Sequence, residues 1–220
     1  MIANSLEQAR INMVKQQIRT WEVLDPKVLD LVTRIPREEF VPEEYRELAF
    51  ADTEIPIGHG QRMMAPKLEA RILQALDIQP GDNILEIGTG SGYLTACLAS
   101  MGAVVTSLDI HADFTAKAGE RLKAQGIENA VLLTDNGLSE PRKEGPFDVI
   151  VVTGSLPKID ERLKRQLALG GRLFGVSGDS PAMEAILITR VGDYQWRDEA
   201  IFETDLERLE MPDAVAEFVF

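Results

Sequence analysis

The sequence contains little cysteine and no long hydrophobic run. Its 220 residues include a single cysteine, Cys97. One cysteine can form neither an internal disulfide nor a zinc cluster, and we predict no metal site. No stretch approaches the roughly 18 apolar residues of a membrane-spanning helix, and residues 1–23 lack the apolar segment of a signal peptide. These absences favour a reducing compartment, and we expect a cytoplasmic protein.

Positive charge is also scarce. The chain has 23 Lys and Arg against 36 Asp and Glu, which gives a net charge of −13. Such an acidic surface repels phosphate backbones and anionic lipids, so we expect no nucleic-acid partner and no membrane partner. Hydrophobic residues make up 45% of the chain, which is enough for a core and excludes intrinsic disorder. Nothing in the composition predicts the oligomeric state.

Residues 1–78 are predicted to form a helical extension. Apolar residues at helical spacing indicate helices over 5–21, over a short stretch after Asp25, and over 67–77. The segment 36–66 is rich in proline and is predicted to be mostly loop, with one helical turn near 43–48.

Strands alternate with helices in residues 79–220. The expected strands are 83–88, 103–110, 130–135, 147–154 and 172–178, and the expected helices are 92–101, 113–126 and 160–171. Alternation of this kind predicts right-handed crossovers and a mostly parallel sheet. Residues 183–202 indicate a final strand pair, which predicts an antiparallel edge. We therefore predict one domain, 1–220, with a doubly wound α/β fold and an N-terminal helical extension.

The most informative segment is Leu-Glu-Ile-Gly-Thr-Gly-Ser-Gly over 85–92, at a strand-to-helix junction. Its glycines allow a sharp turn and a close approach of the backbone to a ligand. Gly88 and Gly90 fit a dinucleotide fingerprint, but the third glycine, Gly92, comes one position early. The acidic Glu86 would repel a pyrophosphate, whereas it suits a ligand with a cationic end.

Acids also end the next two predicted strands. Asp109 comes 23 residues after Glu86 and could accept hydrogen bonds from both hydroxyls of a ribose, while Asp135 could meet an adenine edge. Taken singly, these features also fit a tight turn, a helix cap, or a site for NAD or another nucleotide. Together they resemble class I S-adenosylmethionine methyltransferases, whose first motif is acid-x-Gly-x-Gly-x-Gly. The resemblance implies S-adenosyl-L-methionine as cofactor, bound by Glu86, Gly88, Thr89, Gly90, Gly92, Asp109, Asp135 and Asn136.

A larger part of the chain, roughly residues 8–190, resembles one family. The matching motifs are, in order, Phe40-Val41-Pro42, Ile55-Pro56-Ile57-Gly58, Gly60-Gln61, Pro66, the run over 85–99, the strand over 147–153, Gln166-Leu167 and Gly170-Gly171-Arg172-Leu173. This order and spacing are similar to those of protein-L-isoaspartate (D-aspartate) O-methyltransferases. The resemblance implies methylation of the free α-carboxylate of isoaspartyl residues in damaged proteins or peptides. The methyl ester then promotes succinimide formation and repair.

Residues 60–66, here called the acceptor loop, depart from the family pattern Gly-Gln-Thr-Ile-Ser-x-Pro. Gln61, Arg62 and Met64 are the candidate catalytic residues. Met64 replaces the serine that is linked to activity, and Arg62 replaces the threonine. An acceptor carboxylate is already ionised at pH 7 and needs no general base, so catalysis depends on positioning. Arg62 could hold such an anion through two hydrogen bonds. We expect weaker isoaspartyl activity than in a typical member.

Other positions near the predicted site also differ from the family. Its Gly-Asp-Gly is Thr134-Asp135-Asn136 here, and its Thr-Ala-Ala is Thr153-Gly154-Ser155. Two alternatives therefore stay open: a methyltransferase of the same fold with another, small anionic acceptor, and a non-catalytic regulator that binds the cofactor. We expect His111 to be exposed near the ribose, and the acid-rich segment 198–217 to form a solvated rim.

Overall fold

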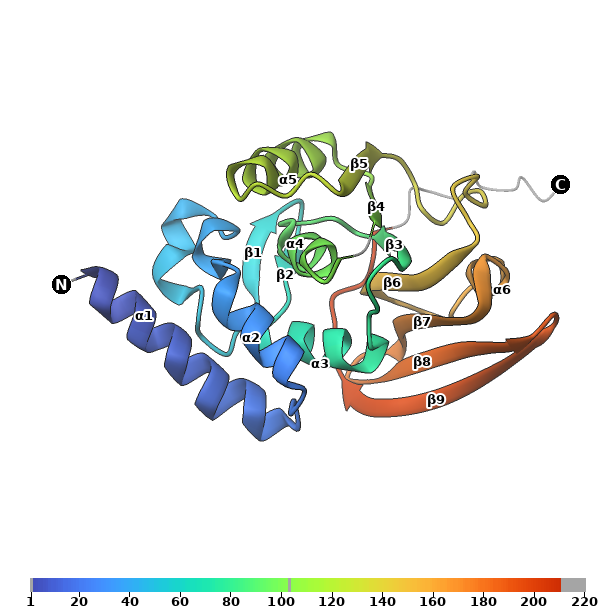
Figure 1. Ribbon diagram of the computed structural model, residues 1–220, viewed down its shortest axis with the longest axis horizontal. Helices are drawn as coiled ribbons and strands as arrows, with labels where there is room; N and C mark the ends of the chain where they lie inside the picture. Colours follow the sequence, from blue (N-terminus) through green and yellow to red (C-terminus); the bar gives the residue numbers. More distant parts are fainter. Residues whose placement is uncertain (1, 103, 211–220) are drawn as a thin grey trace, which may run out of the picture.

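The computed structural model describes residues 2–102 and 104–210 (Figure 1). A seven-stranded sheet lies at its centre, with strand order β5-β4-β3-β6-β7-β8-β9. These strands are β3 (Asn83–Ile87), β4 (Val104–Asp109), β5 (Ala130–Thr134), β6 (Phe147–Leu156), β7 (Leu167–Asp179), β8 (Ala182–Gly192) and β9 (Gln195–Thr204). Neighbouring strands from β5 to β7 in this order are parallel. The pairs β7–β8 and β8–β9 are antiparallel. The predicted doubly wound fold with an antiparallel edge is confirmed.

The central strands are buried on both faces. Ile84 and Val149 belong to one hydrophobic cluster, together with the helices of the N-terminal region. Leu85 and Ile150, one residue further along, belong to a second cluster with Leu163. Successive side chains of a strand point to opposite faces, so strands covered on both sides consist of almost uninterrupted apolar residues. This explains why these strands could be recognised in the sequence.

Helices flank the sheet (Figure 1). They are α1 (Ile2–Asn12), α2 (Pro26–Arg34), α3 (Pro66–Leu76), α4 (Tyr93–Ser100), α5 (Ala112–Ala124) and α6 (Glu161–Arg165). The predicted helix over 5–21 is α1 followed by a π-helical stretch, Met13–Ile18, and a 3₁₀ turn, Arg19–Trp21. Shorter 3₁₀ segments, Arg37–Glu39 and Glu43–Leu48, precede the acceptor loop. Within the described residues, no helix combines the length and apolar character needed to cross a membrane.

A hairpin was missing from the prediction for residues 36–66. Strands β1 (Ile55–Gly58) and β2 (Gln61–Met63) pair antiparallel and form a separate small sheet. The turn between them has three successive residues with positive φ: Gly58 at 111°, His59 at 52° and Gly60 at 71°. The proline and glycines that suggested a loop therefore shape a tight hairpin, which carries the acceptor loop.

The predicted helix over 160–171 is wrong in its second half. Helix α6 ends at Arg165, and β7 begins at Leu167. Leu167 is fully buried and pairs with Phe147 of β6. A Cβ at Gly171 would lie 2.9 Å from the carbonyl oxygen of Phe147, so the glycine permits a close approach of the two strands. Pairing between strands that are distant in the sequence therefore overrides the helical spacing of the leucines in 160–171.

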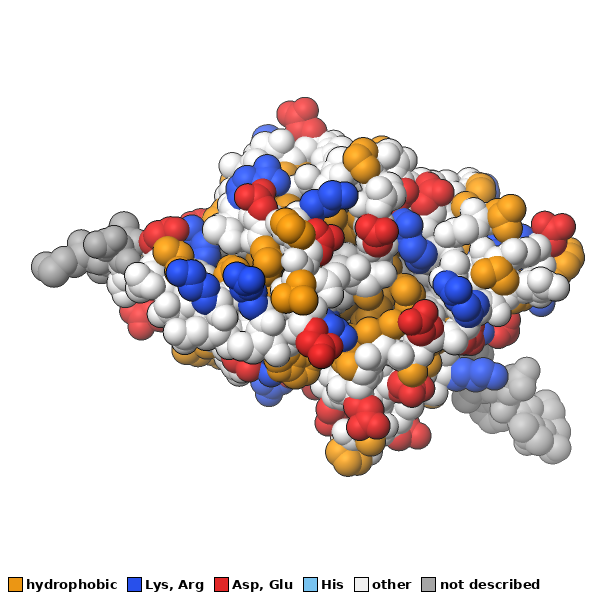
Figure 2. Space-filling view, turned by 60° about the horizontal axis from the view of Figure 1, so that its bottom comes forward, with side chains coloured by type: hydrophobic (Ala, Val, Ile, Leu, Met, Phe, Trp, Pro, Cys, Tyr) orange, Lys and Arg blue, Asp and Glu red, His pale blue; other side chains and the backbone are white. Residues whose placement is uncertain are grey.

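Acidic and basic side chains are interspersed on the face of the molecule that Figure 2 shows. On the face in Figure 2, Asp and Glu side chains lie among Lys and Arg and do not form one continuous acidic field. The excess of acidic residues, which gives the net charge of −13, therefore does not form a single acidic patch on this face.

Candidate functional site

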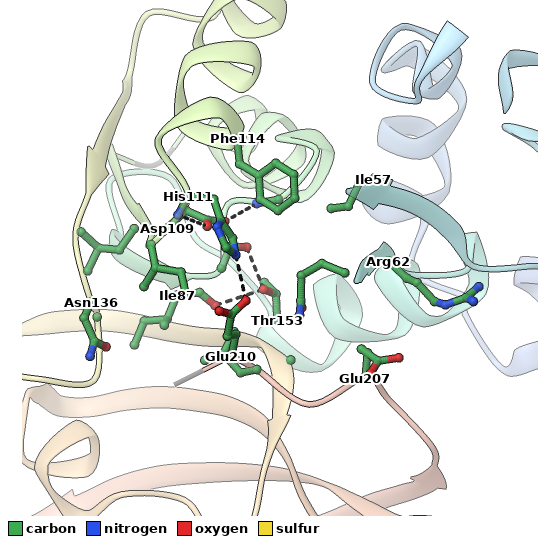
Figure 3. A pocket seen from close by; sticks show the side chains of 18 of the residues that line it. Ile57, Arg62, Ile87, Asp109, His111, Phe114, Asn136, Thr153, Glu207 and Glu210 are labelled. Carbon is green, nitrogen blue, oxygen red and sulfur yellow. Dashed lines mark hydrogen bonds and ion pairs between the residues drawn. The ribbon is translucent and has the colours of Figure 1, made fainter. Parts of the chain in front are cut away.

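A cleft opens where the parallel strands β3, β4 and β6 end (Figure 3). It holds about 650 Å³ of empty space, its mouth to solvent included. The loops after these strands, the β1–β2 hairpin and the C-terminal segment 206–210 line it. Carboxyl ends of parallel strands are the usual ligand site of open α/β sheets. Of the residues predicted from the sequence, this outer cleft brings together Gln61, Arg62, Gly88, Gly90, Asp109, Asp135 and Asn136.

A smaller pocket, here called the inner pocket, lies beside the outer cleft, and residues of the acceptor loop line it. It holds about 320 Å³ of empty space. Arg62, Gly88 and Gly90 line both spaces. The predicted residues that line only the inner pocket are Met64, Glu86 and Thr89. Gly92 lines neither of the two spaces and is the N-cap residue directly before α4.

The glycine loop, residues 88–92, needs its glycines for packing. Gly88, Gly90 and Gly92 have φ values of 100°, 51° and 84°. A Cβ on Gly88 would lie 2.1 Å from the hydroxyl oxygen of Thr153, and one on Gly92 would lie 2.7 Å from Ala118 Cβ. Gly90 is different, because its Cβ would meet only Ile57, at 3.2 Å. Ile57 and Gly90 both line the cleft, so this part of the glycine loop borders the cleft.

Asp109 ends β4 and is held rigidly on the wall of the cleft. It is 7% exposed. Its Oδ2 accepts a hydrogen bond from the Gly90 N–H at 2.8 Å, and its Oδ1 accepts one from the His111 N–H at 3.0 Å. Each carboxylate oxygen can accept a further hydrogen bond. The carboxylate is therefore oriented by the backbone while it keeps capacity to bind hydroxyl groups in the cleft.

Glu86 is a buried carboxylate with one unused oxygen. Its Oε2 accepts a hydrogen bond from the Thr95 hydroxyl of α4, whereas Oε1 has no partner in the described part of the chain. Burial raises the pKa of Glu86 to about 7, and the negative charges of Asp109 and Glu69 act in the same direction. A buried acceptor without a partner is costly. A cationic group entering the inner pocket would satisfy it.

Asp135 and Asn136 line the other end of the outer cleft. Asp135 forms an ion pair with Arg142 at 2.7 Å, and this hydrogen bond lowers the pKa of Asp135. The side chain of Asn136 accepts a hydrogen bond from the Leu138 N–H at 3.0 Å. Both side chains therefore stabilise the loop after β5 as well as bordering the cleft.

The acceptor loop presents an unpaired cation. Arg62 is exposed, and within the described residues its side chain makes no hydrogen bond or ion pair. Gln61 beside it is half-buried and also borders the cleft. Met64 is 6% exposed, and its side chain lines the inner pocket. The positive charge of Arg62 does act on Glu54, where it partly offsets the rise in the pKa of Glu54 that burial causes. The loop thus combines a guanidinium that makes no hydrogen bond within the described residues with an apolar wall.

Sequence reasoning missed the role of the C-terminal segment. Part of the predicted solvated rim runs along the end of β6, where the Ser155 N–H donates to the Glu207 carbonyl at 2.9 Å and the Leu209 N–H donates to the Ser155 carbonyl at 3.0 Å. A Cβ on Gly154 would lie 2.9 Å from the Leu209 backbone, so this glycine makes room for the segment. Residues 211–217 of the predicted rim lie outside the described residues.

Two histidines stack at the mouth of the cleft, which no sequence signal indicated. The rings of His59 and His111 are 3.9 Å apart and nearly parallel, at 13°. His111 also pairs with Glu210 of the C-terminal segment at 3.0 Å (Figure 3), so its side chain is only 17% exposed and the expected solvent exposure is wrong. His59 pairs with Asp113 at 2.9 Å. In the described part of the chain, no three His, Cys, Asp or Glu side chains are grouped to hold a metal ion.

The sequence and the fold have counterparts in known proteins. The sequence profile of the protein-L-isoaspartate (D-aspartate) O-methyltransferase family matches residues 8–190. Protein-L-isoaspartate O-methyltransferase 1 of Rhodopseudomonas palustris (strain HaA2) is 40% identical over 189 residues, which cover 86% of this chain and 77% of the relative. A protein-L-isoaspartate O-methyltransferase of Koribacter versatilis is 38% identical over 186 residues, which cover 84% of this chain and 82% of that relative.

A solved structure has the same fold. It is a candidate protein-L-isoaspartate O-methyltransferase from Plasmodium falciparum in complex with S-adenosyl-L-homocysteine, with a TM-score of 0.78 and 22% identity. The match covers 91% of this chain and 98% of that structure. On the sequence matches, the chain belongs to the protein-L-isoaspartate (D-aspartate) O-methyltransferase family.

Proposed function

We propose that the protein uses S-adenosylmethionine to methylate the carboxylate of isoaspartyl residues in damaged proteins or peptides, in the cytoplasm. Family membership supports the reaction class. The observation that carries the proposal is that the two spaces share lining residues, Arg62 among them. Asp109 stands in the outer cleft, Glu86 in the inner pocket, and the unpaired Arg62 borders both. A cofactor and an anionic acceptor bound in these spaces would therefore lie next to each other, beside Arg62.

The residues of the cofactor half fit S-adenosylmethionine. Asp109 would accept hydrogen bonds from ribose hydroxyls, and Gly90, which lines both spaces, would bring its backbone close to the ligand. The unused Oε1 of Glu86 would accept a hydrogen bond from an ammonium group. The cofactor supplies a methyl group activated by a sulfonium. The chain contributes orientation and a negative electrostatic environment for a cationic ligand.

The acceptor half depends on Arg62. A carboxylate acceptor is ionised at pH 7, so no residue needs to remove a proton. The free guanidinium of Arg62 would hold the carboxylate by charge-assisted hydrogen bonds. Gln61 borders the same cleft and could donate a further hydrogen bond from its amide. Met64 offers no hydroxyl, and its role is to close the inner pocket with apolar surface.

The test is methyl transfer to a pair of peptides that differ only in an isoaspartyl or aspartyl linkage. We expect methylation of the isoaspartyl peptide alone, together with calorimetric binding of S-adenosylmethionine and S-adenosylhomocysteine. Cofactor binding without turnover of any acceptor would indicate a regulator. Turnover of a small anionic acceptor but not of the peptide would indicate the other alternative.

A further inference from the structure

Arg37 is a charged side chain without access to solvent. Its exposed fraction is 0%, and it is the largest fully buried side chain in the described part of the chain. Its Nε donates to the Ala49 carbonyl at 2.8 Å, and its Nη2 donates to the Met64 carbonyl at 2.6 Å. Its Nη1 donates to the carboxylate of Glu69. A buried guanidinium is tolerated only where its donors are paired, so these three contacts fix its position.

The partners of Arg37 come from separate segments. Ala49 follows the 3₁₀ segment Glu43–Leu48, Met64 belongs to the acceptor loop, and Glu69 lies on α3. The guanidinium carbon also lies 4.8 Å from the centre of the Tyr93 ring. Tyr93 is the first residue of α4, directly after the glycine loop. One side chain therefore connects the acceptor loop to the helix that follows the glycine loop.

Arg37 itself lines neither the outer cleft nor the inner pocket. Two of its partners, Met64 and Glu69, do line the inner pocket. Any influence of Arg37 on a bound acceptor must therefore pass through these partners. Arg62, the free cation of the acceptor loop, lies two residues before the carbonyl that Arg37 holds.

We propose that Arg37 is a positioning residue for methyl transfer. Its guanidinium holds the Met64 carbonyl and thereby fixes the acceptor loop, with Arg62, against the glycine loop. The inference rests on the proposed function, because it concerns the same site. The cofactor half has its own backbone contacts through Asp109 and Gly90, so loss of Arg37 should affect the acceptor step and spare cofactor binding.

The informative variant is Arg37→Lys. Lysine keeps a positive charge for Glu69, but its single ammonium cannot also reach the carbonyls of Ala49 and Met64 in the geometry of a guanidinium. Misplacement of reacting groups by about 1 Å costs on the order of 100-fold in rate. We expect kcat to fall about 10- to 100-fold and the acceptor KM to rise. The dissociation constant of S-adenosylhomocysteine should change by less than roughly threefold, since Arg37 makes none of the hydrogen bonds that orient Asp109 at the glycine loop.

Arg10 provides a matched control. Its side chain is 16% exposed, it pairs with Glu38, and its guanidinium carbon lies 5.3 Å from the centre of the Phe50 ring. Like Arg37, it pairs with a carboxylate and lies over an aromatic ring, but its hydrogen-bond partners in the described part of the chain, Glu7 and Glu38, include no backbone carbonyl, and neither belongs to the acceptor loop. Arg10→Lys should lower the melting temperature while leaving kcat within about twofold of the wild type. An equal loss of kcat in both variants would overturn the inference.

Amide hydrogen exchange gives a readout that does not depend on activity. Exchange at residues 62–65 should be about tenfold faster in Arg37→Lys and unchanged in Arg10→Lys. If the wild type does not methylate the isoaspartyl peptide, the proposed function fails, while the exchange rates still test the contact with the loop. Unchanged exchange at residues 62–65 would reject the positioning role.

If Arg37→Lys does not fold, Glu69→Gln replaces it. Glutamine keeps an oxygen acceptor for Arg37 but removes the charge that fixes the guanidinium. We expect a smaller rise in exchange at residues 62–65, about threefold, with a parallel loss of kcat. A folded Glu69→Gln variant with wild-type exchange and wild-type kcat would overturn the inference as well.

Discussion

The carboxylate of Asp109 accepts a hydrogen bond from the backbone N–H of Gly90 at 2.8 Å. This contact joins the end of β4 to the glycine loop after β3. The second oxygen of Asp109 is held by the His111 N–H at 3.0 Å. The same acid therefore shapes the loop and faces the cleft, which makes it the most direct test of cofactor binding.

Replacing Asp109 with Ala should weaken S-adenosylmethionine binding by about 1.5–3 kcal/mol, because a charged acceptor for ligand hydroxyls is lost. Calorimetry measures the effect. Asp113→Asn is the control, since Asp113 pairs with His59 at the surface and does not line the cleft. Tight NAD binding, or no binding of S-adenosylmethionine to the wild type, would contradict the cofactor assignment.

Glu86→Gln should stabilise the free protein in a pH-dependent way. The folded-state pKa of Glu86 is raised to about 7 from an ordinary value of 4.5, so its contribution to stability is present below pH 4.5 and is lost as the pH rises through 7. Glutamine does not ionise, so the Glu86→Gln variant does not lose this stability as the pH rises. We expect it to gain about 3 kcal/mol in unfolding free energy at pH 8 and less than about 1 kcal/mol at pH 5.

Urea unfolding without ligand at both pH values measures this gain, and Glu120→Gln on the exposed side of α5 is the control. The same Glu86→Gln variant should bind S-adenosylmethionine more weakly, because the carboxylate no longer faces a cation. A variant with unchanged stability and unchanged affinity would show that the charge of Glu86 is irrelevant.

The C-terminal segment leads to a third prediction. A Cβ at Gly154 would lie 2.9 Å from the backbone of Leu209, which cannot move without disturbing its hydrogen bond to Ser155. Gly154→Ala should therefore destabilise the fold by about 1–3 kcal/mol, as overpacking does. Gly119→Ala, in the interior of α5, meets nothing closer than 3.7 Å and should instead stabilise by about 0.5–1 kcal/mol. Chemical denaturation of both variants tests the contrast, and equal stability of the two would contradict it.

Local signals account for what the sequence predicted correctly. The glycine loop and the acids at Glu86 and Asp109 stand at strand ends that are recognisable from apolar runs. The alternation of strands and helices likewise predicts the sheet, because each element is marked by its own residues. For the same reason, the order and spacing of the motifs were enough to suggest the family.

Contacts between distant residues account for what was missed. The start of β7 at Leu167 is decided by its pairing with Phe147, 20 positions earlier, whereas the local spacing favours a helix. The stacked rings of His59 and His111 are brought together only by the fold. The burial of Arg37 is likewise set by partners 12, 27 and 32 residues away.

The altered acceptor loop gives the final prediction. Met64 lacks the hydroxyl of the family serine, so wild-type activity on isoaspartyl peptides should be weak for this family. The double variant Met64→Ser with Arg62→Thr restores the family's loop chemistry. A recovered hydrogen-bond donor is worth about 1–3 kcal/mol, or roughly 5- to 150-fold in rate. Replacing Met64 also removes a buried apolar side chain, because Met64 is 6% exposed. The double variant should therefore lose about 2–5 kcal/mol of unfolding free energy.

Rate and stability must therefore be measured together, with each single variant as a control. Arg62→Thr alone should lose activity, since it removes the only charged group proposed to hold the acceptor carboxylate. A double variant that is less stable yet faster on the isoaspartyl peptide would show that the loop limits the reaction. Robust wild-type turnover that the double variant does not improve would show instead that Arg62 and Met64 form an effective acceptor site, and that an ionised carboxylate needs a guanidinium more than a hydroxyl.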